Sequence, residues 1–420
     1  MTFRATVALM MGAALTWACS SESADPGAGG GGAAGAAGAA GDDAGMGGAA
    51  AAGGEAGVGG GGAGMAGQGG AGGGAAGAPA TGGSGGGTSL PTCKKAGGNR
   101  CAATKAECAG LTTFASSDCT SCCLVPSNPV FDASWADPFM VRNGGTYWTF
   151  ATGGSVRRRS SKDLVHWSAI DSAISSAPWK KPSAGFWAPT VYHAKNGKWI
   201  LYYAAERSGN TTQHCIGRAV ANSISGTFVD SAQEPFLCHS SYWSIDPSVF
   251  RDANGKDYLV WRQDTAAQSK GNAYIRPLDD AGKLTGTEHL LISRAKSQPS
   301  WEFDASGGVL ENPAMLHKGG TYHLFYSGYR WQTAKYANGH ALCDAPFGPC
   351  SKTSKANPWQ GSKGHMLGPG GADFASAADG TLFIYMHGWH EPNEGPPNGT
   401  RKLWMYRMDV NGKAVSISPM

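Results

Sequence analysis

The sequence carries little charge, and that charge is not gathered in one place. Only 15% of the 420 residues are charged, and the formal net charge is +4. No stripe of Lys and Arg and no nucleic-acid recognition motif is present, which argues against a nucleic-acid partner. The Gly-rich stretch follows no predicted strand and opens no predicted helix, so it does not form a phosphate-binding loop.

Long hydrophobic runs are also missing. The apolar run in residues 5–15 is too short to span a bilayer, and it lies in a segment, residues 1–19, that is typical of an export signal. Residues 15–19 resemble a bacterial lipobox, although Trp17 departs from its small residues. We therefore expect a secreted protein or a surface or periplasmic lipoprotein, whose link to the membrane is a lipid on Cys19. Plain cleavage and secretion is the alternative.

Large side chains are scarce in residues 20–90, which are almost entirely Gly and Ala from about residue 26 onward. Such a segment cannot bury enough apolar surface to offset its conformational entropy, and its interleaved glycines disfavour a helix. We expect a disordered spacer without chemistry of its own.

Cysteine is dense directly after this linker. Six of the 11 cysteines of the chain fall in residues 91–125: Cys93, Cys101, Cys108, Cys119, Cys122 and Cys123. A segment of this size cannot build a sufficient core, so three disulfides are expected, and the sequence leaves their 15 connectivities open. Cys119-Thr-Ser-Cys122 has the spacing of a zinc or redox motif, but no second such motif or histidine pair accompanies it.

The remaining cysteines also suit disulfides. Assigning Cys19 to a lipid leaves an even number that can pair. By proximity, we expect Cys215 to pair with Cys238 and Cys343 to pair with Cys350.

Residues 126–420 lack a convincing amphipathic helix and instead repeat one pattern five times. Each copy has a short apolar run, a Gly-bearing turn and a second run rich in aromatic and β-branched residues, which predicts a β-hairpin. The turns are about 52 to 65 residues apart, at Gly145, Gly197, Gly255, Gly320 and Gly380. This period predicts an all-β fold, a five-bladed β-propeller, preceded by the linker and the Cys-rich module.

Three acids stand near the starts of these repeats. Asp137 and Asp246 each precede a proline, and Glu311 lies two residues before one. The first strand of each propeller blade lines the central channel, so these carboxylates should converge on one pocket. Turn capping is the common role of such acids, but the second repeat has Trp187 and Ala188 at this place, so a cap is not required.

Carboxylates crowded in one pocket repel one another and raise at least one pKa. Glycoside hydrolysis is suited to such a cluster, because it needs one ionised and one protonated carboxyl group across the scissile bond.

The motifs around these acids resemble glycoside hydrolase family 43 over about residues 126–409. They are Ala136-Asp137-Pro138, Trp187-Ala188-Pro189, Ile245-Asp246-Pro247 and Glu311-Asn312-Pro313. The resemblance implies an inverting hydrolase without a required cofactor, acting on α-L-arabinofuranosyl or β-D-xylosyl linkages of plant-type polysaccharides or oligosaccharides. Asp137 matches the general base, Glu311 the general acid, and Asp246 the acid that orients Glu311 and keeps its pKa high. For a water to fit, the acid and base should be roughly 6.5 to 9.5 Å apart.

One departure from the family leaves metal dependence open. Many members open the last blade with Gly-His, whose histidine helps to hold a calcium or sodium ion on the propeller axis. Here the residues are Gly370 and Gly371, so that histidine is missing. Asp373 is a substitute contact or a turn cap, and His387 either lines the substrate pocket or packs in the core.

Sugar binding requires flat apolar faces, and Trp187 and Trp243 are the predicted substrate-binding aromatics. Other aromatic residues beside blade starts and ends either share that role or pack between blades: Trp135, Phe186, Tyr329, Trp331 and Trp389.

Two alternatives remain. A retaining fructosidase of the related five-bladed type would open with Asn-Asp-Pro-Asn-Gly, whereas this chain has Ala136-Asp137-Pro138-Phe139. A sugar-binding propeller without turnover is the second alternative. We expect a monomer, and the sugar, the linkage and the choice between chain-end and internal attack stay open.

Overall fold

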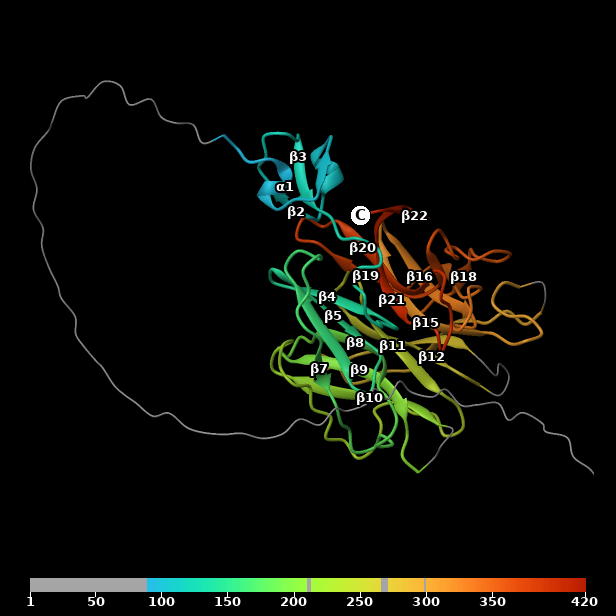
Figure 1. The fold of residues 1–420 in the computed structure, drawn as a ribbon. Helices are drawn as coiled ribbons and strands as arrows, with labels where there is room; N and C mark the ends of the chain where they lie inside the picture. Colours follow the sequence, from blue (N-terminus) through green and yellow to red (C-terminus); the bar gives the residue numbers. More distant parts are fainter. Residues whose placement is uncertain (1–88, 210–212, 266–270, 298–299) are drawn as a thin grey trace, which may run out of the picture. The chain divides into compact units, whose positions relative to one another are not determined.

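The computed structural model describes residues 89–209, 213–265, 271–297 and 300–420 (Figure 1). The export signal predicted for residues 1–19, with Cys19, and nearly all of the linker predicted for residues 20–90 lie outside the described residues. Within the described ranges, no helix combines the length and apolar character needed to cross a membrane.

The Cys-rich module is a small three-stranded antiparallel sheet with two short helical turns. The sheet has the order β1-β3-β2. Its elements are α1 (Cys93–Ala96), β1 (Arg100–Ala102), η1 (Lys105–Cys108), β2 (Thr112–Phe114) and β3 (Ser121–Leu124). Every strand has only three or four residues, so the sheet alone buries little apolar surface.

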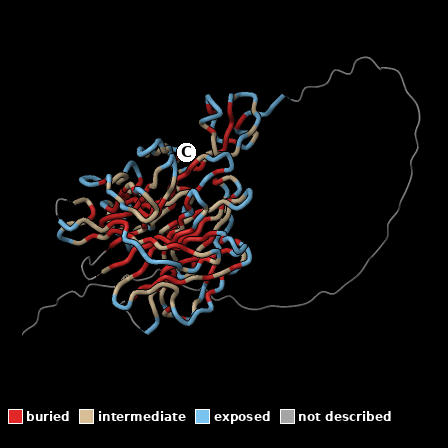
Figure 2. Tube along the Cα trace, turned by 180° about the vertical axis from the view of Figure 1, so that it is seen from behind, coloured by how far each residue is buried: buried red, intermediate tan, exposed pale blue. Residues whose placement is uncertain are grey.

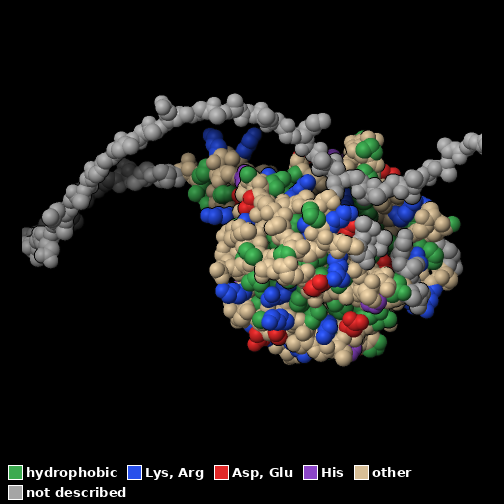
Figure 3. All heavy atoms as spheres, turned by 90° about the horizontal axis from the view of Figure 1, so that it is seen from below, with side chains coloured by type: hydrophobic (Ala, Val, Ile, Leu, Met, Phe, Trp, Pro, Cys, Tyr) green, Lys and Arg blue, Asp and Glu red, His purple; other side chains and the backbone are tan. Residues whose placement is uncertain are grey.

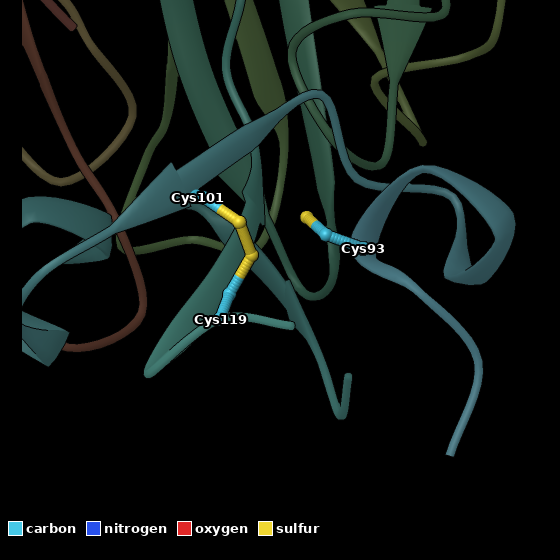
Figure 4. Close-up of side chains that lie close together, drawn as sticks. All are labelled: Cys93, Cys101 and Cys119. Atoms are coloured by element: carbon cyan, nitrogen blue, oxygen red, sulfur yellow. A yellow bond between two sulfur atoms is a disulfide. The ribbon is translucent and has the colours of Figure 1, made fainter. Parts of the chain in front are cut away.

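Disulfides hold this module together, as predicted. They join Cys93 to Cys122, Cys101 to Cys119 and Cys108 to Cys123. The sulfurs of Cys93, Cys101 and Cys119 lie close to one another (Figure 4), and they are the one group of three or more potential metal-ligating side chains in the described part of the chain. Because each of these sulfurs is in a disulfide, none is a free thiolate for zinc.

The propeller consists of five antiparallel sheets, each made of consecutive strands, so the predicted all-β class is confirmed. The first blade contains β4 (Phe139–Asn143), β5 (Thr146–Ala151), β6 (Val156–Ser161) and β7 (Asp171–Ile174). The second contains β8 (Trp187–His193), β9 (Trp199–Glu206) and β10 (His214–Ala221). The third contains β11 (Ser244–Arg251), β12 (Asp257–Gln263), β13 (Asn272–Pro277) and β14 (His289–Ser293). The fourth contains β15 (Val309–Lys318), β16 (Thr321–Tyr329), β17 (Ala337–Cys343) and β18 (Cys350–Lys352). The fifth contains β19 (Met366–Ser376), β20 (Leu382–His390), β21 (Arg401–Asn411) and β22 (Ala414–Ser418).

A glycine with a left-handed backbone lies in the turn between the first two strands of every blade. Gly197, Gly255, Gly320 and Gly380 have φ values of 80°, 74°, 74° and 84°, a conformation that glycine adopts without a steric penalty. In the first blade, Gly144 rather than the predicted Gly145 takes this conformation, with φ of 57°.

The core lies between the blades and is rich in aromatic side chains. Most strand residues are buried, and most exposed residues lie in the connections. Figure 2 shows the buried segments in the interior and the exposed ones at the periphery. The largest fully buried side chains are Trp135, Trp261, Tyr202, Tyr203, Tyr326, Tyr336, Tyr385, Phe150, Phe186, Phe228, Phe325 and Phe383. Two predicted disulfides, Cys215–Cys238 and Cys343–Cys350, are present in the second and fourth blades. On the face seen in Figure 3, basic and acidic side chains are scattered rather than gathered in one patch.

One residue at the inner edge of every blade has a left-handed backbone. The φ values are 48° at Asp137, 42° at Ala188, 55° at Asp246, 47° at Asn312 and 61° at Gly371. In the last four blades the strand register shifts at this point, as at a β-bulge. A bulge bends the strand and re-aims its side chains, so the same kink recurs around the channel.

Candidate active site

The inner edges of all five blades meet around one small cavity on the propeller axis. Its volume is about 30 Å³, and its lining includes the left-handed residues Asp137, Ala188, Asp246, Asn312 and Gly371. Asp137 and Asp246 therefore line one cavity, whereas Glu311, which was predicted to share it, is not part of the lining. Glu311 precedes Asn312 on β15 and is buried beside it.

Asp137 is held as an ionised carboxylate. Arg401 on β21 donates from Nη1 to its Oδ1 at 3.1 Å, and the Thr152 hydroxyl donates to its Oδ2 at 2.8 Å. Burial by itself would raise the pKa of Asp137. The charge of Arg401 and these hydrogen bonds outweigh burial and hold the pKa below its usual range.

His387 lies behind Asp137. The backbone amide of Asp137 donates to Nδ1 of His387 at 3.0 Å, and the side chain of His387 is fully buried. Burial, aided by the charge of Arg401, lowers the pKa of His387 to about 3, so the ring is neutral. The ring also lies parallel to that of Tyr336, with centroids 5.8 Å apart. His387 thus supports the backbone of Asp137 and the wall of the site.

Glu311 has the opposite environment. Its Oε2 accepts a hydrogen bond from Nη1 of Arg262 at 2.7 Å, and its Oε1 accepts one from the Tyr336 hydroxyl at 2.7 Å. Burial raises the pKa of Glu311, and the negative charge of Asp137 adds to this effect. Arg262 and Tyr336 oppose the rise without cancelling it.

Asp246 forms a coupled pair with Glu311. Burial, followed by the nearby charge of Glu311, raises the pKa of Asp246 well above its usual range. Its Oδ2 accepts a hydrogen bond from the backbone amide of Asn312 at 3.0 Å. Two buried carboxyl groups that interact in this way titrate as a pair, so one proton is retained between them to higher pH than either would keep alone.

Aromatic side chains stand on two sides of these acids. Trp187 stacks on His214 with ring centroids 4.3 Å apart, and Trp243 lies 4.1 Å from the same histidine. On the side of Asp137, the guanidinium of Arg401 lies 4.5 Å from the ring centroid of Trp331. The three tryptophans are partly exposed, so their faces are available to a ligand.

The other candidate aromatics pack within the protein. These are Trp135, Phe186, Tyr329 and Trp389, which are all buried.

The axial cavity does not offer the histidine that the family uses beside a metal ion. A Cβ atom added to Gly371 would lie 3.0 Å from Nδ1 of His387, so the His387 ring occupies the space that a side chain at position 371 would enter. Asp373 is the third carboxylate that lines the cavity, beside Asp137 and Asp246, and no other acid contributes to its pKa shift. It accepts a hydrogen bond from Ser248 at 3.2 Å, and burial raises its pKa to about 7. Position 371 therefore supplies no side-chain ligand to an ion on the axis.

Several residues of the site were missed in the sequence. They are Thr152, Arg262, Tyr336 and Arg401, which lie at or near the ends of second and third strands or in a connection. One usable signal existed: Arg262 follows Tyr258-Leu-Val-Trp261 inside a strand whose residues are all buried, and a buried arginine requires a carboxylate partner.

Known proteins of similar sequence include several glycosidases. The chain is similar to the extracellular exo-α-(1→5)-L-arabinofuranosidase ArbA of Cellvibrio japonicus, with 30% identity over 211 residues that cover 46% of this chain and 58% of the relative. It is 25% identical to the β-D-galactofuranosidase xynD of Aspergillus niger over 248 residues, which cover 54% of this chain and 66% of the relative. The matches thus span less than two thirds of either relative.

Solved structures share the fold. A thermostable family-43 glycoside hydrolase matches with a TM-score of 0.62 at 23% identity, covering 70% of this chain and 96% of that one. An endo-1,4-β-xylanase from Bacteroides thetaiotaomicron matches with a TM-score of 0.58 at 28% identity, covering 68% and 95%. The family model for glycosyl hydrolases family 43 matches residues 126–413, which is more than half of the chain. The chain therefore belongs to glycosyl hydrolases family 43.

Proposed function

We propose that this protein is an inverting glycoside hydrolase that cleaves α-L-arabinofuranosyl or β-D-xylosyl linkages in plant-type polysaccharides. One observation carries the proposal: carboxyl groups from three blades lie together, with Asp137 and Asp246 lining the axial cavity and Glu311 buried beside it. Their surroundings lower the pKa of Asp137 and raise the pKa of the other two. A glycosidase needs such a division between an ionised and a protonated carboxyl group.

Each acid has one role in this reaction. Asp137, held ionised by Arg401 and Thr152, takes a proton from a water molecule as that water attacks the anomeric carbon. Glu311 gives its proton to the glycosidic oxygen as the bond to the leaving group breaks. Asp246 shares its environment with Glu311 and helps the pair to retain a proton.

The aromatic residues supply the binding surface. Trp187 and Trp243 stand on the side of the site where Arg262 approaches Glu311, and Trp331 stands on the side of Arg401 and Asp137. Sugar rings stack on such faces because their C–H groups are apolar. His387 acts through Asp137 rather than on the sugar, since its side chain is fully buried.

The names of similar proteins support the substrate class. They include an exo-acting arabinofuranosidase, an endo-acting arabinanase of Thermotoga petrophila and a xylosidase/arabinosidase of Humicola insolens. Both pentose classes therefore belong in the first substrate panel, and β-D-galactofuranosides should be included because of the Aspergillus niger relative.

The test is sugar release from arabinan, arabinoxylan, xylan and aryl glycosides, with the first anomer formed followed by proton NMR. The purified protein should release a product of inverted configuration. Glu311→Gln and Asp137→Asn should each abolish release from the polysaccharides while the thermal unfolding transition is retained. A product of retained configuration would contradict the inverting mechanism, and oligosaccharide binding without any release would support a sugar-binding propeller instead.

The protein would act outside the cytoplasm, tethered through Cys19 by a lipid and the Gly/Ala linker. The disulfides of the described part of the chain suit an oxidising compartment. Mass spectrometry of the mature N-terminus tests the anchor: a diacylated Cys19 is expected. An unmodified terminus beyond Cys19 would show plain secretion.

A further inference from the structure

Arg262 joins Glu311 to a fourth carboxylate that the catalytic roles above do not use. Its Nη1 donates to Glu311 Oε2 at 2.7 Å, while its Nε and Nη2 donate to Oδ1 and Oδ2 of Asp264, both at 3.1 Å. Every nitrogen of the guanidinium is thus engaged. The side chains of Arg262, Asp264 and Glu311 are only 5%, 11% and 11% exposed, so solvent screens these charges weakly.

This arrangement poses a chemical problem for the proposed acid. An arginine 2.7 Å from a buried carboxyl group favours the ionised form, whereas a general acid must begin the reaction protonated. Asp264 offsets this effect, because its carboxylate forms a two-point pair with the same guanidinium and neutralises much of its charge. Glu311 then gains a fixed orientation from Arg262 without the full field of an unpaired cation.

The hydrogen bonds around Glu311 can accommodate a proton. The Tyr336 hydroxyl lies 2.7 Å from Glu311 Oε1 and 2.9 Å from Asn312 Oδ1. When Glu311 is ionised, the hydroxyl can donate to Glu311. When Glu311 is protonated, the hydroxyl can donate to Asn312 and accept the proton of Oε1, while Oε2 still accepts from Arg262.

We propose that Arg262 and Asp264 are a positioning pair for the general acid: Arg262 orients the carboxyl group of Glu311, and Asp264 balances the charge of Arg262 so that Glu311 keeps its proton at the pH of catalysis. This inference rests on the proposed hydrolase function. The other ionisable groups around Glu311 stay unchanged in the test below; they are Asp137 before β4, Asp246 on β11, Tyr336 before β17, His387 on β20 and Arg401 on β21.

The two members of the pair should act on Glu311 in opposite directions. The basic limb of the kcat/KM profile reports loss of the proton from the general acid in the free enzyme. Arg262→Gln removes a cation, so the limb should move to higher pH. Asp264→Asn leaves that cation unbalanced, so the limb should move to lower pH. The shift in Arg262→Gln should be about one pH unit or more, since a charge within about 4–6 Å shifts a pKa by roughly 1–3 units. The shift in Asp264→Asn should be smaller, because Asp264 acts on Glu311 through Arg262.

The double variant, with both substitutions, should place the limb between those of the single variants. Arg262→Lys provides a second substitution if Arg262→Gln does not fold, because it keeps the charge but loses the two-point pair. It should leave the limb nearer to wild type while lowering kcat. Thermal unfolding of every variant identifies those that fold.

Arg158 offers a matched control in the first blade. Its side chain is also 5% exposed, and its Nε and Nη2 form a two-point pair with Asp171 at 3.0 and 2.7 Å, although Asp171 itself is 56% exposed. Its Nη1 donates to backbone carbonyls, not to a catalytic acid. Arg158→Gln should lower the unfolding temperature without moving either limb of the pH profile.

A second measurement separates this inference from the hydrolase proposal. Titration of ¹³C-labelled glutamate side chains, with the Glu311 signal assigned by its loss in Glu311→Gln, reports the protonation of Glu311 without any turnover. Opposite shifts in Arg262→Gln and Asp264→Asn support the positioning pair. Shifts in the same direction, or none beyond those of Arg158→Gln, overturn it. Absence of sugar release by the wild-type protein would overturn the hydrolase proposal, while the titration would still decide what the pair does to Glu311.

Discussion

The two sides of the candidate active site hold carboxyl groups whose pKa values are displaced in opposite directions. Asp137 receives hydrogen bonds from Arg401 and Thr152, and no carboxylate is paired with that arginine in the described part of the chain other than Asp137 itself. Glu311 also contacts an arginine, Arg262, but Arg262 is already paired with Asp264. The charges of Glu311 and Asp246 also interact. The pKa of Asp137 is lowered and that of Glu311 is raised.

This difference teaches that contact with an arginine does not by itself set the state of a buried acid. The effect on the acid depends on whether other carboxylates already neutralise the charge of that arginine. The same reasoning supports the proposal that the base lies on the side with Arg401 and the acid on the side with the Arg262–Asp264 pair.

The largest expected effect separates the two sides by their dependence on the leaving group. Glu311→Ala should slow release of poor leaving groups by about 10²- to 10⁴-fold and largely spare activated aryl glycosides, because these need no proton to depart. Asp137→Ala should slow release from poor and good leaving groups alike, because in both cases no base is present to take a proton from the attacking water. Equal losses on both substrates in Glu311→Ala would contradict the assignment, and a series of aryl glycosides of graded leaving-group pKa measures it.

Asp246→Asn should reduce kcat by about 100-fold at the pH optimum and move the basic limb to lower pH. A neighbouring carboxylate disfavours ionisation of Glu311 because the two negative charges repel each other. Without Asp246, Glu311 therefore loses its proton at lower pH. A pH profile of kcat/KM checks the direction. A basic limb that stays in place would show that Asp246 does not influence Glu311.

Arg401→Gln should affect the other limb of the profile. The charge of Arg401 favours ionised Asp137, and the base is active only when ionised, so removing this charge should raise its pKa and move the acidic limb up by about one to two pH units. Arg401→Lys keeps the charge and is the matched control, with a smaller shift expected. Loss of activity at every pH without a shift of this limb would indicate that Arg401 serves binding through Trp331 rather than the state of Asp137.

The smallest effect is expected at Thr152. Its hydroxyl donates to Asp137 Oδ2 and accepts a hydrogen bond from the backbone amide of Ala188 at 2.9 Å, so it links the first two blades. Thr152→Val should cost roughly tenfold in kcat/KM, the loss of a hydrogen bond to a charged group, whereas Thr152→Ser should remain close to wild type. Identical rates for the two variants would show that the hydroxyl is not used.

Much of the fold was predictable because it repeats. The hairpin pattern around each turn is local in sequence, so five copies of it identified the blades, and proximity identified the Cys215–Cys238 and Cys343–Cys350 disulfides. The pairing within the Cys-rich module was not predictable, because six cysteines in so short a segment allow many pairings of similar spacing.

The partners of the acids were harder to predict than the acids. Asp137 and Arg401 are 264 positions apart, and only the closure of the first blade against the fifth brings them together. The repeat pattern also hid a distinction. Asp137 and Asp246 occupy the left-handed position of their blades, whereas Glu311 precedes it and corresponds to Trp187 in the second blade. That distinction is a property of backbone torsion, which residue types alone do not reveal.

The five left-handed positions restrict how such a propeller can change its chemistry. A non-glycine residue in this conformation costs about 1–2 kcal/mol, and β-branched side chains are excluded most strongly, while Asp, Asn and Gly are tolerated best. A new activity that evolves at these five positions would therefore use only a few residue types, chiefly Asp, Asn and Gly. A single substitution is then enough to add or remove a carboxylate there. Ala188 occupies one of these positions and lines the cavity with an unreactive methyl group. A designer could therefore place a further carboxylate or amide at position 188 without changing the backbone conformation.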